Sequence, residues 1–527
     1  MNIAFDPWIP TVNATGDREL ASLHDMLTEG SRFSDLAVQP HERISLMRLF
    51  LCVAHAALDG PKTYDDWCDV PSDLPEAAGI YLKKWQDSFE LFHPEKPWLQ
   101  VAKLVPLTKD SAAKTDPQKD WISLSRLKFT KASGNNSTLF DSAARGSLET
   151  EYTPEEIALN LLVFQNFFVA GGKASSRCWG KQKIENPPNP KGGPCSGKSI
   201  LYTFLRGQNL AETIFLNLNS FEDLAYHYED ASDWLGKPLW EQPITSPDDQ
   251  AAIDNATRTH LGRLVPQTRQ LCIHQNRQSI LLGAGFTYPK YQDTGNTFHP
   301  DTFATMVRNQ KEERILLSAK PDIAIWRELH SLVVKRKNNT DSGCGALCLL
   351  NSPDAESCDI VVCAMITNPT KAAEIVDLVE SVFHIPAQLR VPEGTVAYEA
   401  EVKHAATWQG RLAWAVESYR AEIDGGWEGR LKSAGPKKHL LRQKLHAQAT
   451  GFFWTSVEKQ LPLLMAYIKA IDTDDAQPRR ELWRATLGTI ARDAYRTACG
   501  QETPRKMRAF ANGWRKLFIK SEATNEV

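Results

Sequence analysis

The clearest helical patterns in the N-terminal half of the chain lie in two apolar segments. Residues 42–58, ERISLMRLFLCVAHAAL, place apolar side chains almost all the way round a helix, and residues 154–168, PEEIALNLLVFQNFF, repeat the spacing. A helix that is apolar on all sides is buried in a protein interior. We therefore predict two helices here, and we expect the first of them in the hydrophobic core.

Short apolar runs bounded by turn residues predict strands in the rest of this half. Runs rich in aromatic and β-branched residues are typical of strands. The runs that we expect to form strands are residues 3–9, 98–104, 200–205, 213–218, 278–288, 314–319 and 359–366. Together with the two helices they indicate a mixed α/β region.

The pattern becomes helical after about residue 366. Apolar side chains recur at helical spacing, as at Leu412, Val416, Tyr419 and Ile423, in residues 372–383, 411–423, 440–461 and 481–495. Four amphipathic helices in sequence are typical of an antiparallel bundle. The chain is thus expected to belong to the α+β class, with a large mixed α/β N-terminal domain in residues 1–365 and an all-α four-helix bundle in residues 366–527.

Composition limits the class of protein without identifying it. Of the 527 residues 42% are hydrophobic, which is enough for sizeable cores, and the net charge is −3. The start, MNIAFDPWIP, has no signal-peptide pattern, and no apolar run approaches the ~18 residues of a membrane helix. We therefore expect a cytoplasmic protein, in which the ten irregularly spaced cysteines are mostly reduced core residues.

Positive charge is concentrated near the C-terminus. Residues 401–527 contain 22 Lys and Arg against 14 Asp and Glu. In the last helical segment, residues 505–518, Arg505, Arg508 and Lys516 share one half of the helix, whereas Met507, Trp514, Leu517 and Phe518 share the other. Such a basic stripe suits a phosphate backbone, and it equally suits a solvated surface.

The string GGPCSGKS at residues 192–199 matches the phosphate-loop pattern G-x-x-x-x-G-K-[ST]. A true phosphate loop follows a buried strand and opens a helix, whose N-terminus points at the phosphates. Here three prolines and several charges in residues 181–191 exclude a buried strand before the motif, and the run that follows, ILYTFL, predicts a strand. The context thus disfavours a nucleotide hydrolase that uses Lys198.

Two other constellations have a structural alternative that we favour. His24-Asp25 is a pair used by some metal-dependent nucleases, but it lies in an amphipathic stretch without companion ligands. Cys344, Cys348, Cys358 and Cys363 suggest a zinc site, yet the last two lie five positions apart in a predicted strand and therefore on opposite faces. We predict no metal, no cofactor and no catalytic residue.

Several motifs occur in an order that identifies a family. They are FDPWIP at residues 5–10, the helix at 42–58, GNNSTLFD at 134–141, the glycine pair at 171–172 and LRGQNLAETIFLNL at 205–218. In this combination the chain resembles the CasA family, the large subunit of the type I-E CRISPR Cascade complex. The resemblance is dense over residues 1–60 and 130–220 and weaker elsewhere.

The resemblance implies a non-catalytic subunit of an antiviral, RNA-guided surveillance complex. Such a subunit reads the protospacer-adjacent motif (PAM) in double-stranded DNA, promotes duplex opening and R-loop formation, and recruits the helicase-nuclease that degrades the target. The implied partners are the CRISPR RNA, the target DNA, the helicase-nuclease, and the backbone, 5′-handle-binding and small subunits of Cascade. The alternatives from other classes are the nucleotide hydrolase and a purely structural scaffold subunit.

The resemblance also assigns candidate nucleic-acid-binding residues. Phe140, Asp141 and Ser142 match a loop that touches the guide RNA and the PAM region. Gly171 and Gly172 match a loop in which backbone approaches base edges, with Lys173 beginning a basic segment that extends to Lys198, and Lys290 matches a lysine that donates to the PAM bases. From the residues alone, the favoured interpretations are a helix cap at the glycine pair, a structural loop at Phe140–Ser142 and a solvated turn at Lys290.

One position departs from the family pattern. The family places a glutamine on a hairpin that wedges under the first base pair, and residues 350–356 contain none. Asn351 is the nearest chemical substitute, so the strand-separating role is transferred to this segment as a hypothesis only.

Overall fold

The protein is described by a computed structural model. It describes residues 1–102, 104–106, 121–128, 151–168, 177–179, 182–184, 192–195, 199–225, 233–289, 303–308, 311, 313–321, 323–334, 343–344, 357–368, 375–424 and 436–518. The chain divides into two compact units, one formed by residues 1–323 and 334–384 and the other by residues 324–333 and 385–527. Within the described ranges, no helix is long and apolar enough to cross a membrane.

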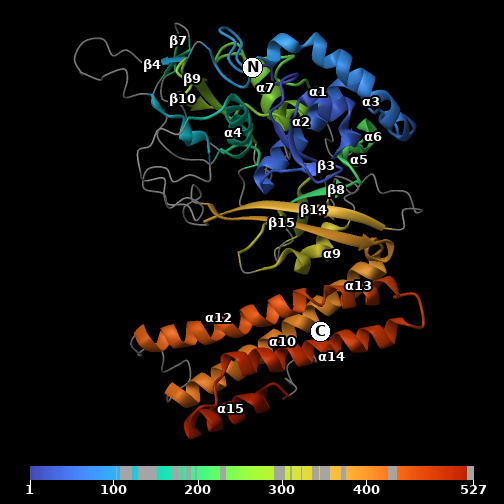
Figure 1. Ribbon diagram of the computed structural model, residues 1–527, viewed down its shortest axis with the longest axis vertical. Helices are drawn as coiled ribbons and strands as arrows, with labels where there is room; N and C mark the ends of the chain where they lie inside the picture. The colour runs from blue at the N-terminus through green and yellow to red at the C-terminus, as the bar shows by residue number, and fades with distance from the viewer. Residues whose placement is uncertain are drawn as a thin grey trace, which may run out of the picture. The chain divides into compact units, whose positions relative to one another are not determined.

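The core of the first unit is built round helix α2 (Pro40–Leu58) (Figure 1). Pro40 occupies its first turn, and Gln39 and Glu42 form a reciprocal capping box at its start. As predicted, this helix is buried on nearly all sides. Its one fully buried cation, Arg48, donates to the carbonyls of Arg263 and Leu264, so the charge is satisfied by the C-terminal end of another helix, α8 (His260–Leu264).

Other helices surround α2 and cover its faces. Those that contact it include α1, α3, α4, α5 and α8. Their bounds, with those of the remaining helices and 3-10 turns of the unit, are α1 Leu23–Thr28, η1 Gly30–Arg32, α3 Tyr64–Lys84, η2 Gln86–Phe89, η4 Leu124–Leu127, α4 Pro154–Phe167, α5 Leu210–Asn217, α6 Phe221–Ala225 and α7 Gln250–Arg258. The helix predicted at residues 154–168 is thus confirmed as α4.

The strands of this unit pair in small sheets. In the described part of the chain there are five sheets of three strands each. Their orders are β2 (Arg18–Ala21), β1 (Ile9–Asn13), β3 (Phe33–Leu36); β5 (Ile122–Ser123), β10 (Ser279–Gly285), β9 (Arg269–Ile273); β12 (Arg314–Leu316), β11 (Thr305–Arg308), β13 (Gly343–Cys344); β15 (Ile375–Pro386), β14 (Ser357–Thr367), β8 (Tyr202–Arg206); and β4 (Leu104–Pro106), β6 (Arg177–Trp179), β7 (Gln182–Ile184).

Three of the strand predictions were wrong in whole or in part. The apolar run at 213–218 lies mostly in helix α5, because Asn209 caps the backbone N–H of Glu212 and starts a helix before the run. The strand expected at residues 3–9 begins only at Ile9, and the one expected at 98–104 begins only at Leu104. The strands predicted within 200–205, 278–288, 314–319 and 359–366 are confirmed as β8, β10, β12 and β14.

The second unit is helical, as predicted, and the chain therefore belongs to the α+β class. Its long helices are α10 (Pro392–Asp424), α12 (Pro436–Glu458), α14 (Ala476–Ala498) and α15 (Pro504–Lys516), and α10 contacts the other three (Figure 1). The short elements of the unit are η5 (Ile325–Glu328), α9 (Leu329–Leu332), η7 (Ala387–Arg390) and α13 (Leu461–Lys469).

One member of the predicted bundle was wrong. Residues 372–383 were expected to form its first helix, but residues from Ile375 onward form strand β15. The segment is rich in Ile and Val, which favour strands, and exposure alternates from Val379 to His384 with a period of two. The fourth long helix is instead α15, and the compact first unit extends beyond residue 365.

Candidate nucleic-acid interface

The C-terminal end of α4 is held by one buried side chain, Gln165. Its amide donates to the carbonyls of Leu99 and Arg269, at 3.0 Å each, and its carbonyl oxygen accepts from the backbone N–H of Arg269 at 2.9 Å. The side chain is fully buried, so all three hydrogen bonds are shielded from water. Gln165 therefore fixes the end of α4 against the start of strand β9.

The residues that begin β9 complete this junction. The hydroxyl of Thr268 donates to the backbone carbonyl of Gln165, and the guanidinium of Arg269 lies 4.6 Å from the ring centre of Phe168, directly after α4. The carbonyl of Thr268 in turn accepts from Phe286, which follows β10. The end of α4, the start of β9 and the end of β10 are thus tied together by hydrogen bonds.

Two segments that contain predicted site residues begin close to this junction, and a third begins near the end of α4. Gly171 lies three residues beyond Phe168, and Lys290 lies two beyond Tyr288, whose hydroxyl accepts from the backbone N–H of Gln267 at 3.0 Å. Three residues of chain span at most about 10 Å. The structure therefore anchors the glycine-pair segment and the Lys290 segment at neighbouring points.

The third segment, which contains Phe140, begins after Lys128. Lys128 follows η4, which contacts α4, and it lies near His41, whose ring centre is 6.3 Å from that of Phe167. Burial, and after it the positive charge of Lys128, lowers the pKa of His41 to about 3, so this imidazole is neutral at physiological pH. His41 is therefore a packing residue between α2 and the end of α4.

Most of the predicted site residues themselves lie outside the described residues. These are Phe140, Asp141, Ser142, Gly171, Gly172, Lys173, Lys290 and Asn351. Their assignments stay predictions, and the described residues supply the positions from which their segments leave the fold.

The first half of the phosphate-loop string is described and packs against the end of α4. The N–H of Gly193 donates to the carbonyl of Phe168 at 2.8 Å, and the N–H of Cys195 donates to that of Asn166 at 3.1 Å. In a phosphate loop these amides would point at phosphate oxygens. Here they satisfy carbonyls at the negative end of a helix, an environment that disfavours an anion.

The sequence after the string also follows the prediction. Residues Tyr202–Arg206 form strand β8, so the first regular element among the described residues after the string is a strand and not a helix. Before the string, residues Gln182–Ile184 form the short strand β7, in a segment where we expected no buried strand. The contacts of Gly193 and Cys195 remain the stronger argument against nucleotide binding.

The three basic residues predicted on the last helix lie against α10. The guanidinium of Arg508 pairs with the carboxylate of Glu422 at 3.2 Å, and that of Arg505 donates to the Glu422 carbonyl at 3.5 Å. The ammonium of Lys516 lies 4.5 Å from the ring centre of Trp414. Arg508 keeps 78% of its side chain exposed, so it stays accessible to an anion.

The apolar half of α15 is buried only in part. Met507 and Phe518 are more than half exposed, whereas Ala509, Gly513 and Leu517 are buried. A Cβ on Gly513 would lie 2.1 Å from the Tyr495 hydroxyl and 2.5 Å from the Ala415 carbonyl. The absence of a side chain at Gly513 therefore permits this close approach of α15 to α10 and α14.

The alternative metal sites receive structural roles. Asp25 belongs to the capping box of α1, with its carboxylate accepting from the N–H of Ser22. Cys363 is buried in β14 and Cys358 is half-buried in the same strand. Throughout the ranges that the structure describes, no group of three or more His, Cys, Asp or Glu side chains could hold a metal ion.

Sequence reasoning missed the Gln165 junction and a second polar cluster. Arg43, in the apolar helix α2, bonds through Nη1 to Asp35 and through Nε to Glu380 at 2.9 Å, and Arg206 also reaches Asp35, at 3.1 Å. The sequence feature that could have indicated both is a polar residue inside an otherwise apolar run, because a buried polar side chain requires hydrogen-bond partners. The identity of the partners was not readable from local sequence.

The described fold is that of a two-unit α+β protein in which the segments with the predicted site residues begin close to the end of helix α4. Residues 2–494 match the family described as CRISPR-associated protein Cse1, and the chain belongs to that family. The resemblance to the CasA family is thereby confirmed. A curated relative, the CRISPR-associated protein CasA/Cse1 of Thermus thermophilus, is 24% identical over 506 residues, which cover 94% of this chain and 91% of the relative.

Solved structures agree on the fold. The crystal structure of Thermus thermophilus CasA matches with a TM-score of 0.71 at 20% identity and covers 98% of both chains. A chain of a structure described as a CRISPR RNA-guided surveillance complex matches with a TM-score of 0.68 at 17% identity, covering 98% of this chain and 99% of that one. At these identities the likeness establishes the fold.

Proposed function

We propose that the protein is a non-catalytic recognition subunit of a CRISPR RNA-guided surveillance complex. In this role it reads the PAM in double-stranded DNA, promotes duplex opening and R-loop formation, and recruits the helicase-nuclease. Membership of the Cse1 family supports the proposal, as does the fold shared along nearly the whole length of a chain from such a complex. Its partners would be CRISPR RNA, target DNA, the helicase-nuclease and the other Cascade subunits.

The observation that carries the recognition role is the shared anchorage of the predicted site segments. The Gly171-Gly172 segment and the Lys290 segment leave from residues joined by Gln165, Thr268 and Arg269. A short DNA motif occupies only a few base pairs, so residues that read it must lie close together. Anchoring both segments on one rigid junction meets that requirement.

Arg269, in the junction, and Arg263, in helix α8 beside Tyr288, have structural roles. Arg263 donates to the carbonyl of Thr257 at 2.8 Å, and its guanidinium lies 5.8 Å from the ring of Tyr288. Arg263 and Arg269 are both at least 95% buried, so DNA phosphates do not reach them in this structure. We therefore assign DNA contact to the cations of the segments themselves, above all Lys290 and Lys173.

A nucleotide hydrolase is the alternative that the Gly193 and Cys195 contacts oppose, and Lys198→Ala tests it. We expect neither the wild-type chain nor the variant to hydrolyse ATP in the presence of Mg²⁺. A wild-type activity that is abolished by Lys198→Ala would instead support the hydrolase. A subunit that acts as a scaffold would assemble normally and leave binding independent of the PAM, which distinguishes it from a recognition subunit.

A further inference from the structure

A cavity of about 500 Å³ in the first unit is lined by four tryptophans, and we call it the tryptophan pocket. The four residues come from distant parts of the chain and are Trp85, Trp98, Trp179 and Trp240. Three of them are buried, whereas Trp85, directly after α3, is only half-buried. The indole N–H of Trp240 donates to the hydroxyl of Tyr81 at 2.6 Å, which fixes this side chain. The pocket therefore has an aromatic lining that is built into the fold.

The tryptophan pocket adjoins the junction at the end of α4. Its lining includes Leu99, whose carbonyl accepts from Gln165, and Gln267, whose backbone N–H donates to the Tyr288 hydroxyl at 3.0 Å. Lys290 follows Tyr288 by two residues, which span at most about 7 Å. The pocket therefore lies beside the point at which the Lys290 segment leaves the described fold.

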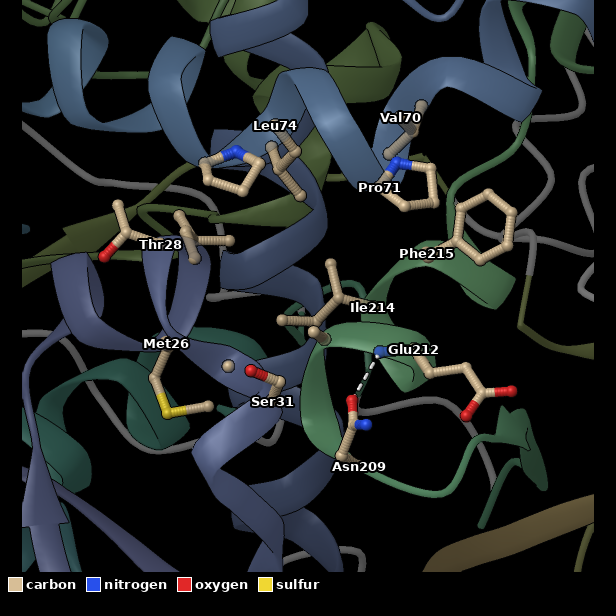
Figure 2. A pocket seen from close by; sticks show the side chains of 14 residues that line it. Met26, Thr28, Ser31, Val70, Pro71, Leu74, Asn209, Glu212, Ile214 and Phe215 are labelled. Carbon is tan, nitrogen blue, oxygen red and sulfur yellow. Dashed lines mark hydrogen bonds between the residues drawn. The ribbon is translucent and has the colours of Figure 1, made fainter.

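One deeply buried polar side chain of the pocket lining, that of Gln267, lacks a hydrogen-bond partner among the described residues. Only 7% of the residue is exposed. The cavity of about 390 Å³ between α1, α3 and α5, drawn in Figure 2, gives a contrast: there the side chain of Asn209 accepts from the N–H of Glu212 at 3.0 Å, as the dashed line marks. Burying an amide without a partner costs free energy. Gln267 therefore offers a donor and an acceptor to a ligand in the tryptophan pocket.

The formal charges round the tryptophan pocket balance. The ammonium of Lys84 lies 5.4 Å from the ring centre of Trp85, and Lys96 is an exposed residue of the lining. The carboxylates of Glu95 and Glu241 belong to the same lining. Two positive and two negative charges favour neither an anion nor a cation, so we expect an uncharged ligand.

An uncharged ligand of this pocket must present an aromatic surface to the tryptophans and a hydrogen-bonding edge to Gln267. An apolar protein side chain would leave the Gln267 amide without a partner, whereas a nucleobase has both features. We propose that the tryptophan pocket captures one base of the target DNA that duplex opening has unpaired next to the PAM. The target strand pairs with the guide RNA, so the displaced strand supplies this base. The inference rests on the proposed function, which brings the DNA to the end of α4.

The test uses the assembled complex and a PAM-containing target duplex whose first protospacer pairs are already opened by mismatches in the displaced strand. At each opened position in turn, the base of the displaced strand is replaced by an abasic site. The replacement costs no base pairing, because the bubble is already open. We expect one position at which the abasic site weakens binding about tenfold, since the stacking of that base on the pocket is lost.

Two variants and one control link that position to the pocket. Gln267→Met keeps the size of the side chain and the backbone N–H that bonds to Tyr288, and Trp85→Ala removes part of the aromatic lining. Each is expected to weaken binding of the intact bubble and to reduce the abasic effect from about tenfold to about threefold or less, because base and pocket act together. Trp121→Ala changes a half-buried tryptophan outside the lining and should leave both measurements unchanged. Thermal unfolding confirms that each variant folds, and Gln267→Met keeps the test valid should Trp85→Ala unfold.

Two kinds of failure can be told apart. If no position is sensitive to the abasic site, or if the pocket variants leave the abasic effect at its wild-type size, the pocket captures no base, although the complex still prefers duplexes with the PAM. Binding that does not depend on the PAM would instead contradict the proposed function, and base capture would be overturned with it.

Discussion

The substitution that tests the structural basis of the candidate interface most sharply is Gln165→Leu. The two side chains are similar in size, but leucine removes all three hydrogen bonds that Gln165 makes with Leu99 and Arg269. Two carbonyls and one N–H would then be buried without these partners, at a cost of about 1–2 kcal/mol each. We therefore expect a loss of about 3–6 kcal/mol in the free energy of unfolding of the first unit, a large share of the ~5–15 kcal/mol typical of a folded domain.

Two measurements check this expectation. Guanidinium unfolding followed by tryptophan fluorescence should show an earlier transition, and the Arg269 amide should lose hydrogen-exchange protection about 100-fold or more, since 1.4 kcal/mol corresponds to tenfold. Gln165→Glu is a matched control that keeps an acceptor for the Arg269 N–H but points a carboxylate at the carbonyls of Leu99 and Arg269. These carbonyls and the burial would raise the pKa of the new carboxyl, so this variant should regain stability as the pH falls, whereas Gln165→Leu should not.

A Gln165→Leu variant with a wild-type unfolding transition and unchanged Arg269 protection would refute the reasoning. It would mean that the end of α4 is held without Gln165, and the shared anchorage of the glycine-pair and Lys290 segments would lose its physical basis.

Two further substitutions probe the two compact units. In the helical unit, Glu401→Gln removes the charge of a fully buried carboxylate that accepts from Arg480 at 2.7 Å and Arg484 at 2.6 Å; because both guanidiniums are about a third exposed, the expected loss is only about 1–3 kcal/mol by thermal or chemical unfolding. Burial opposes ionisation of Glu401, but the two arginines outweigh this effect and hold the pKa of Glu401 below the ordinary 4.5. The ionised carboxylate therefore stabilises the protein above pH 4.5, and this stabilisation is lost as the pH falls. The Glu401→Gln variant should lack this pH dependence. In the first unit, Gly193→Ala would place a Cβ 2.6 Å from the Asn166 carbonyl and 2.9 Å from that of Gln165, so we expect a loss of about 1–3 kcal/mol in the free energy of unfolding. The control is Gly410→Ala in helix α10 of the helical unit, where a Cβ would have nothing within 4 Å; because alanine favours a helix over glycine, this variant should keep or gain stability. A destabilisation by Gly193→Ala no greater than that by Gly410→Ala would contradict the contacts of Gly193.

Local sequence predicted the elements whose pattern agrees with their final environment. Helix α2 is apolar on nearly all sides and is buried on nearly all sides, and β14 is a run with β-branched residues that packs in a sheet. For both elements the spacing of apolar residues and the final burial indicate the same secondary structure. β15 is the instructive failure, because apolar residues at Ile375, Val379 and Val382 fit a helix while their β-branched side chains favour a strand. Pairing with β14, which local spacing does not reveal, decided the outcome.

The candidate site was predictable only in part, for a similar reason. The glycine pair, Lys290 and the loop with Phe140 were assigned by resemblance, and the residues that anchor their segments were not. Gln165 bonds to partners 66 and 104 positions away, and Arg43 bonds to Glu380, 337 positions away. A polar residue in an apolar helix shows that a partner must exist, but its identity depends on the tertiary fold.

The same limit explains the phosphate-loop string. Its eight residues satisfy the pattern, and only the neighbouring elements show that Gly193 and Cys195 direct their amides to the end of α4. The strand after the string was visible in the sequence, whereas these contacts were not.

The central claim, that this subunit recognises a DNA motif through the segments anchored at the end of α4, is tested most directly in the assembled complex. Complexes that carry the wild-type subunit, Lys290→Ala, or Lys320→Ala as an exposed control from the same unit should be compared on target duplexes with and without the PAM, with binding measured at one fixed salt concentration. We predict that the wild type and Lys320→Ala bind the PAM-containing duplex preferentially and that Lys290→Ala loses this preference while still assembling with guide RNA. An unchanged PAM preference in the Lys290→Ala complex would contradict the claim.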